Sequence, residues 1–251
     1  MKNELILYQS NELTSRIEVR IEDETVWLNR HQIATLFGRD VKTIGKHINN
    51  VFSEEELVKE VVKPQDYSAY YLQKTQLYDS LDYGKVDKIF VGDSITDHGE
   101  LQTYFPGEVV LNRGIVDDKS RGVLKRIDEV VKRKPKEVYI LIGINDIGEN
   151  VDVDVYEKNM EEIIQSFDKA STKVIIQSIL PVNNQDFPNK IPNKTVDQFN
   201  EVLQKMAKKH GLEYVDLNPH FKDSDGQLKK ELTVDGVHLS GKGYDLWIEN
   251  L

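Results

Sequence analysis

Four short polar blocks in the second half of the sequence contain the residue types that acyl transfer needs. Ser94 is the candidate nucleophile, His238 is the candidate base, and Asp235 is a carboxylate three residues before that histidine. A serine hydroxyl is a poor nucleophile until a base removes its proton. The base in turn needs a carboxylate that fixes its tautomer and stabilises its cation. We therefore expect a Ser-His-Asp catalytic triad.

The negative charge that develops on a substrate carbonyl oxygen also needs fixed hydrogen-bond donors. The candidates are the main-chain N–H groups of Ser94 and Gly114 and the side-chain amide of Asn145. Loss of one such donor typically lowers turnover by about 10²–10³. Glycine at position 114 would let the main chain approach the substrate without an intervening side chain. These three residues form the predicted oxyanion hole.

The elements that would position these residues are predicted from apolar runs that alternate with amphipathic stretches. The strand-like runs are 88–91, 109–111, 138–142, 174–179 and 213–216, and the helix-like stretches are 122–132, 155–167 and 196–210. Near-continuous apolar strands joined by helices predict an α/β fold with a parallel sheet covered on both faces. Ligands of such sheets bind at the carboxyl ends of the strands. Ser94, Gly114 and Asn145 belong to blocks that follow the first three runs.

Taken in order, these blocks resemble those of the SGNH (GDSL-type) hydrolase family across residues 67–251. The fragments that carry the resemblance are Val-Gly-Asp-Ser-Ile-Thr at 91–96, Leu-Asn-Arg-Gly-Ile at 111–115, Ile-Gly-Ile-Asn-Asp at 142–146 and Asp-Gly-Val-His-Leu-Ser at 235–240. The resemblance implies a three-layer α/β/α, flavodoxin-like fold with a five-stranded parallel sheet, and it implies the residue roles given above. Relatives often carry a second glycine where this chain has Val116-Asp117-Asp118, so the shape of that loop stays open.

Each block taken alone has a simpler interpretation. Gly-Asp-Ser after a strand is often a turn with a helix cap, Asn-Asp is often a loop, and Asp-Gly is often a turn. Four blocks in this order favour the hydrolase. The Gly-x-Ser-x-Gly motif is absent around Ser94, which disfavours an α/β-hydrolase fold. His98, close to Ser94, either lines the pocket or lies on the surface.

The first quarter of the chain has a different pattern. An alternating stretch from Arg16, a polar turn at 22–24 and a second strand from Thr25 predict a hairpin. Two short helices separated by Gly38 follow, and this is the helix-turn-helix pattern. We therefore predict a separate domain at residues 1–65 and a hydrolase domain at residues 66–251.

Residues 4–62 resemble the N-terminal part of RhuM-type proteins of bacterial mobile elements. The resemblance rests on Ile-Glu-Val-Arg at 17–20, on Asp-Glu-Thr-Val-Trp-Leu at 23–28 and on residues 36–48. It implies DNA binding, with residues of the second helix facing a groove. These residues are Arg39, Lys42, Thr43 and Lys46. Acidic residues at 54–56 would repel phosphate, and the alternative is a small helical interaction or dimerisation module, compatible with a homodimer.

Composition narrows the function classes. The 251 residues are 39% hydrophobic and 30% charged with a net charge of -10, which is ordinary for a soluble globular protein and unfavourable for a chain-wide nucleic-acid or anionic-membrane surface. The absence of cysteine excludes disulfides, thiol nucleophiles and thiolate metal sites. No cofactor fingerprint, metal-ligand spacing, signal peptide or bilayer-length apolar run is found. We expect a cytoplasmic protein with no cofactor, no metal and no membrane partner.

These observations predict a serine esterase that removes small acyl groups, with acetyl as the expected group, from a carbohydrate or lipid-like alcohol. The four fragments are similar to those of bacterial acetylhydrolase-like members of the family. The alternative is a DNA-binding or regulatory protein of a mobile element that uses the hydrolase fold as a scaffold. Both hypotheses can hold, because they concern different domains.

Overall fold

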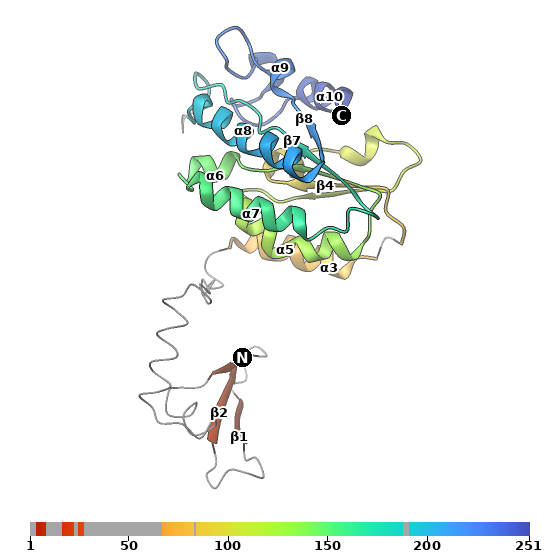
Figure 1. The fold of residues 1–251 in the computed structure, drawn as a ribbon, viewed down its shortest axis with the longest axis vertical. Coiled ribbons are helices and arrows are strands. Elements are labelled where there is room, and N and C mark those ends of the chain that lie inside the picture. The colour runs from red at the N-terminus through yellow and green to blue at the C-terminus, as the bar shows by residue number, and fades with distance from the viewer. Residues whose placement is uncertain (1–3, 9–16, 23–24, 28–66, 83, 188–190) are drawn as a thin grey trace. The chain divides into compact units, whose positions relative to one another are not determined.

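The computed structural model describes residues 4–8, 17–22, 25–27, 67–82, 84–187 and 191–251. The chain divides into two units, Met1–Asp66 and Tyr67–Leu251. In the first unit, β1 (Glu4–Tyr8), β2 (Ile17–Glu22) and β3 (Thr25–Trp27) form an antiparallel sheet in that order (Figure 1). The antiparallel β2–β3 pair is the predicted hairpin, whereas β1 was not predicted. The helix-turn-helix prediction lies outside the described residues, as do its candidate DNA contacts Arg39, Lys42, Thr43 and Lys46.

The second unit is built on the predicted parallel sheet of five strands, in the order β5-β4-β6-β7-β8. The strands are β4 (Lys88–Gly92), β5 (Val110–Gly114), β6 (Glu137–Leu141), β7 (Lys173–Gln177) and β8 (Glu213–Val215). β4 pairs with β5 on one side and with β6 on the other. The chain therefore reverses its direction of progress across the sheet at β4. A reversal of this kind opens a crevice at the carboxyl ends of the strands.

Helices cover both faces of this sheet, which explains why its strands are apolar on both sides. α5 (Ser120–Lys132), α7 (Val153–Gln165) and α8 (Asn193–His210) lie side by side over one face (Figure 1). α10 (Gly241–Glu249) covers the other, where the fully buried Trp247 meets Phe90 edge-on at 6.0 Å between ring centroids. The fold is thus the predicted flavodoxin-like α/β/α sandwich. No helix in the described parts of the chain is long and apolar enough to cross a membrane.

The helix that precedes the sheet, α3 (Ala69–Ser80), packs beside α5 (Figure 1). It begins at the Ser68 cap, whose Oγ accepts the Tyr71 N–H. Its buried tyrosines bond to two other elements: Tyr71 donates to the Gly122 carbonyl in α5 at 2.7 Å, and Tyr78 donates to the Gly114 carbonyl in β5 at 2.7 Å. α3 is therefore attached to the end of β5 as well as to α5.

Candidate active site

The turn from β4 into the short helix α4 (Ser94–Asp97) carries the candidate nucleophile. Asp93 caps α4, and its Oδ1 accepts the Ile95 N–H at 3.0 Å. Ser94 is the first residue of the helix and is 6% exposed. Its main-chain N–H has no acceptor among the described residues. The Ser94 side chain and N–H thus lie together at the carboxyl edge of the sheet.

The loop between η3 (Lys230–Leu232) and α10 brings the other two triad candidates to Ser94. His238 Nε2 lies 3.0 Å from Ser94 Oγ, and His238 Nδ1 lies 2.6 Å from Asp235 Oδ2. The turn is held by Asp235 Oδ1, which accepts the main-chain N–H groups of Val237 and His238 at 3.0 and 2.8 Å. Gly236 has a φ of +94°, a conformation that favours glycine. Three residues that are distant in sequence thereby form one hydrogen-bonded chain.

The His238–Asp235 end of this hydrogen-bonded series is open to solvent, since the two side chains are 31% and 45% exposed. Partial burial raises the pKa of Asp235. The hydrogen bonds from the His238 ring and from the two main-chain N–H groups lower that pKa by more, so it lies below its ordinary value. The carboxylate therefore stays ionised and accepts a hydrogen bond from Nδ1 of the imidazole, which fixes the tautomer of His238.

Gly114 ends β5, where the strand packs closely against α4. Its N–H, expected to face a substrate oxygen, instead donates to Asn112 Oδ1 at 2.8 Å. A Cβ at position 114 would lie 2.1 Å from the Asp97 amide nitrogen, so only glycine lets the strand approach α4 this closely. The Asn112 amide completes the junction by donating to the carbonyls of Thr96 at 2.6 Å and Gly99 at 2.9 Å. The junction fixes α4 against β5.

Asn145 lies in α6 (Ile144–Gly148), directly after β6. Its Nδ2 donates to the Asp118 carbonyl at 3.0 Å, and because an amide has two hydrogens, one remains available for a substrate. The neighbouring Asp117 has a φ of +68°, and its main-chain N–H finds no acceptor in the described residues. This donor was not among the residues predicted from the sequence. The glycine that relatives often carry near position 117 is the sequence feature that could have indicated this donor.

Three buried carboxylates support the loops around the site. Burial, together with the charges of Asp118 and Asp146, raises the pKa of Asp93 to about 7. Burial also raises the pKa of Asp146 to about 6, although hydrogen bonds from Ser120 oppose the shift. Asp118 forms an ion pair with Arg126 at 2.8 Å. The Arg126 guanidinium also donates to the carbonyls of Gly92, the last residue of β4, and Arg113, the last but one of β5. α5 is thereby attached to the carboxyl ends of both strands.

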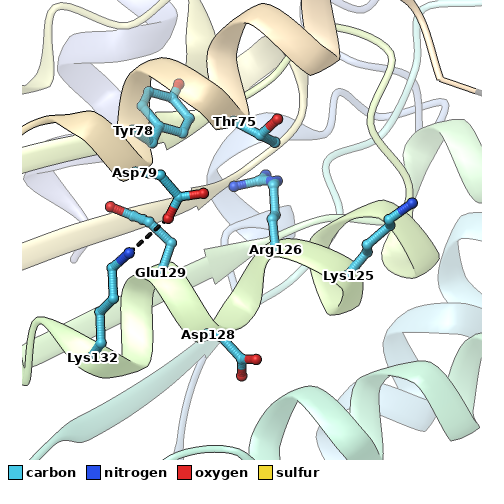
Figure 2. A pocket seen from close by; sticks show the side chains of 8 residues that line it. All are labelled: Thr75, Tyr78, Asp79, Lys125, Arg126, Asp128, Glu129 and Lys132. Carbon is cyan, nitrogen blue, oxygen red and sulfur yellow. Dashed lines mark hydrogen bonds and ion pairs between the residues drawn. The ribbon is translucent and has the colours of Figure 1, made fainter. Parts of the chain in front are cut away.

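Two further features lie near these elements. The exposed His98 caps the C-terminus of α4, and its ring centroid lies 5.2 Å from that of His238. A separate crevice of about 130 Å³ lies between α3 and α5, where Lys132 crosses to Asp79 at 2.6 Å (Figure 2). None of its lining residues belongs to the predicted triad. Within the described residues, no group of three or more His, Asp or Glu side chains is arranged to hold a metal ion.

A serine, a histidine and a carboxylate in one hydrogen-bonded chain, beside unsatisfied N–H donors at the edge of a parallel sheet, is an arrangement typical of serine acyl hydrolases. Residues 90–246 match the model of the GDSL-like lipase/acylhydrolase family, and the chain belongs to this family. It is a carboxylic-ester hydrolase.

Known relatives agree with this assignment. The chain is 31% identical over 169 residues to the platelet-activating factor acetylhydrolase IB subunit alpha2 of Rattus norvegicus, covering 63% of this chain and 71% of that one. It is 27% identical over 199 residues to the acetylxylan esterase of Geobacillus stearothermophilus, covering 62% and 87%. The crystal structure of a GDSL-like lipase from Bacteroides thetaiotaomicron superposes with a TM-score of 0.63 at 25% identity, covering 72% and 94%.

Proposed function

We propose that the protein is a serine esterase that hydrolyses small acyl esters, acetyl esters above all, with Ser94 as nucleophile, His238 as base and Asp235 as the orienting carboxylate. The observation that carries this proposal is the double contact of one imidazole. His238 Nε2 lies 3.0 Å from Ser94 Oγ while its Nδ1 lies 2.6 Å from Asp235 Oδ2. Both distances are within the range for proton transfer and for tautomer selection.

In the first half of the reaction, Ser94 Oγ bonds to the carbonyl carbon of the ester as its proton passes to His238 Nε2. The bond between the carbonyl carbon and the alcohol oxygen then breaks, and the imidazolium gives its proton to the departing alkoxide. In the second half, His238 takes a proton from water, the hydroxide cleaves the acyl-serine ester, and Ser94 regains its proton. The products are a free carboxylic acid and a free alcohol.

The oxyanion formed in each half needs donors that the protein itself leaves unsatisfied. We assign the Ser94 N–H, the second hydrogen of the Asn145 amide and the Asp117 N–H to this role. The Gly114 N–H is less suited, because it already donates to Asn112. Asp117 lies between Val116 and Asp118, and the carbonyl of Asp118 is the one that Asn145 holds. The three donors therefore come from the ends of three neighbouring strands.

The acyl and alcohol groups are proposed from the relatives. The names of the rat and Geobacillus proteins both specify acetyl groups, on platelet-activating factor in one and on xylan in the other. The partly exposed side chains of His238 and Asp235 leave room for a bulky alcohol on the solvent side. A small acyl group joined to a carbohydrate or lipid-like alcohol fits both observations.

The test is hydrolysis of p-nitrophenyl acetate by the full chain. Ser94→Ala should reduce turnover to background, and a fluorophosphonate should label the wild-type protein at Ser94 alone. Ser80→Ala is the matched control, since within the described residues the hydroxyl of this exposed serine at the end of α3 bonds only to the Leu77 carbonyl. Turnover that survives Ser94→Ala would overturn the proposal. A series of p-nitrophenyl esters from acetate to octanoate, together with acetylated xylo-oligosaccharides, would then define the acyl group and the alcohol.

A further inference from the structure

Asp97 ends α4, three residues after Ser94, and its side chain is only 3% exposed. Its carboxylate collects three donors from two other segments. Oδ2 accepts the Tyr70 hydroxyl at 2.6 Å and the Val116 N–H at 3.2 Å, and Oδ1 accepts the Lys74 ammonium at 2.5 Å. One carboxylate thus joins α3, the nucleophile's helix and the loop that follows β5.

The loop that Asp97 holds has two anchors and one strained residue between them. Val116 is anchored to Asp97, and Asp118 is anchored to Asn145 and Arg126. Between them, Asp117 adopts the left-handed conformation, which non-glycine residues rarely adopt. A residue in such a conformation keeps it only where its surroundings hold it there. The hydrogen bond from Val116 to Asp97 is the anchor that connects this loop to α4.

The two partners from α3 hold the carboxylate in place. Burial lowers the pKa of Lys74, but hydrogen bonds to Asp97 and Tyr78 raise it by more, so the ammonium stays charged. Its Nζ also lies 5.3 Å from the centroid of the Tyr78 ring, whose hydroxyl donates to the Gly114 carbonyl. Asp97 consequently contacts the Lys74 ammonium through Oδ1 and the loop after β5 through Oδ2.

We infer that Asp97 is a positioning residue for ester hydrolysis: held by Lys74 and Tyr70, it anchors the Val116 N–H and so directs the Asp117 N–H toward the substrate oxygen. This inference rests on the proposed function, because it needs Asp117 to stabilise the oxyanion. Asp97 itself does not touch the substrate. Its loss should therefore lower kcat and leave KM nearly unchanged, as expected for an interaction that acts in the transition state.

Two double variants separate the anchor from the charge. Lys74→Met/Asp97→Leu removes both charges and the acceptor for Val116, and it leaves no buried ion without a partner. Lys74→Met/Asp97→Asn removes the same charges but keeps an acceptor oxygen. With p-nitrophenyl acetate we expect the first to lower kcat by about 10-fold or more, approaching the loss of an oxyanion donor. The second should stay within about threefold of wild type, because its acceptor remains.

The matched control is Lys132→Met/Asp79→Asn, which removes an exposed ion pair between the same helix α3 and α5 (Figure 2). It should leave kcat unchanged. Thermal unfolding should be measured for every variant to check that it is folded. If the leucine variant does not fold, Lys74→Met/Asp97→Ala repeats the test with a smaller side chain. Equal kcat in the leucine and asparagine variants, or a loss confined to KM, would overturn the inference. Failure of the proposed function itself would be recognised differently, because Ser94→Ala would then still turn over p-nitrophenyl acetate.

Discussion

Gly114 and Asp97 approach so closely that a Cβ on residue 114 would lie 2.1 Å from the Asp97 amide nitrogen. Real Cβ atoms do not come this near to main-chain atoms, so Gly114→Ala must displace either β5 or α4. Because α4 begins at Ser94, we expect kcat to fall by about 10-fold or more and stability to fall by about 1–3 kcal/mol, as in overpacked cores. Gly241→Ala is the control, since no atom lies within 4 Å of its Cβ position. Steady-state kinetics and urea unfolding measure both effects.

Asp235→Asn should retain the fold and lose most of the activity. The amide cannot stabilise the imidazolium, and it favours the wrong tautomer of His238; this change costs about 10⁴ in kcat in serine proteases. We expect a loss of about 10³–10⁴ here, measured with p-nitrophenyl acetate. Asp225→Asn, at an exposed loop position, should leave kcat unchanged. A loss smaller than about tenfold would assign the orienting role to another group.

Asp117 should tolerate glycine and reject β-branched residues. Asp117→Gly keeps the left-handed conformation without strain, so kcat should stay within about twofold. Asp117→Val is expected to lose about 1–2 kcal/mol of stability and at least about 10-fold in kcat, because a β-branched residue is disfavoured at positive φ. Asn150, with a φ of +57°, provides the matched position. Asn150→Val should lose similar stability without changing kcat, and an equal loss of kcat there would contradict the donor role of Asp117.

Stability should decrease as the pH rises through neutrality. Burial raises the pKa of Asp93 to about 7, above its value in the unfolded chain. The folded state therefore binds a proton more tightly, and the stability that this proton contributes is complete below about pH 4 and is lost as pH rises through 7. The slope for one such group is at most about 1.4 kcal/mol per pH unit.

Urea unfolding at pH 5 and pH 8 measures this difference. Asp93→Asn cannot ionise and should make it smaller, while the exposed Asp225→Asn should leave it as in the wild type. Asp146, whose pKa is raised to about 6, adds a change of the same sign, so the difference will shrink without disappearing. An unchanged difference in Asp93→Asn would mean that Asp93 is already ionised at pH 5.

The DNA-binding prediction for the first unit depends on the sequence alone. If the second predicted helix enters a groove, the full chain should bind duplex DNA at low salt. Lys42→Ala and Lys46→Ala should then weaken binding and reduce the slope of log K against log salt by about one for each lysine. Lys205→Ala and Lys208→Ala, on the exposed side of α8, serve as controls. No binding at low salt would favour the interaction-module alternative.

The sequence was sufficient to predict the sheet, and it pointed to the two contacts that His238 makes with Ser94 and Asp235. Apolar runs gave the five strands to within a few residues, because strands buried on both faces have little polar content. Gly114 and Asn145 also lie at or just after strand ends, as predicted. The short helices α4, α6 and α10 were not predicted, since helices of this length leave too few turns for a period to be read.

The oxyanion donors could not be assigned from sequence, because their availability depends on hydrogen bonds between distant segments. Whether the Gly114 N–H is free is decided by the Asn112 side chain, and whether glycine is needed there is decided by α4. Asp97 lies outside the four sequence blocks, one residue after the first of them. Its role follows from partners 23 and 27 residues earlier in the chain, on a helix whose packing only the structure gives.

The segment that matches the family model starts at residue 90, after α3 has ended. The proposed triad is thus inside the matched segment. Tyr78, whose hydroxyl donates to the Gly114 carbonyl, and Lys74, whose ammonium pairs with Asp97, are outside it. A fragment cut to the matched segment would keep every reacting group and lose part of the frame that aligns them. For this chain, the smallest unit that can be expected to work at full rate begins where α3 begins.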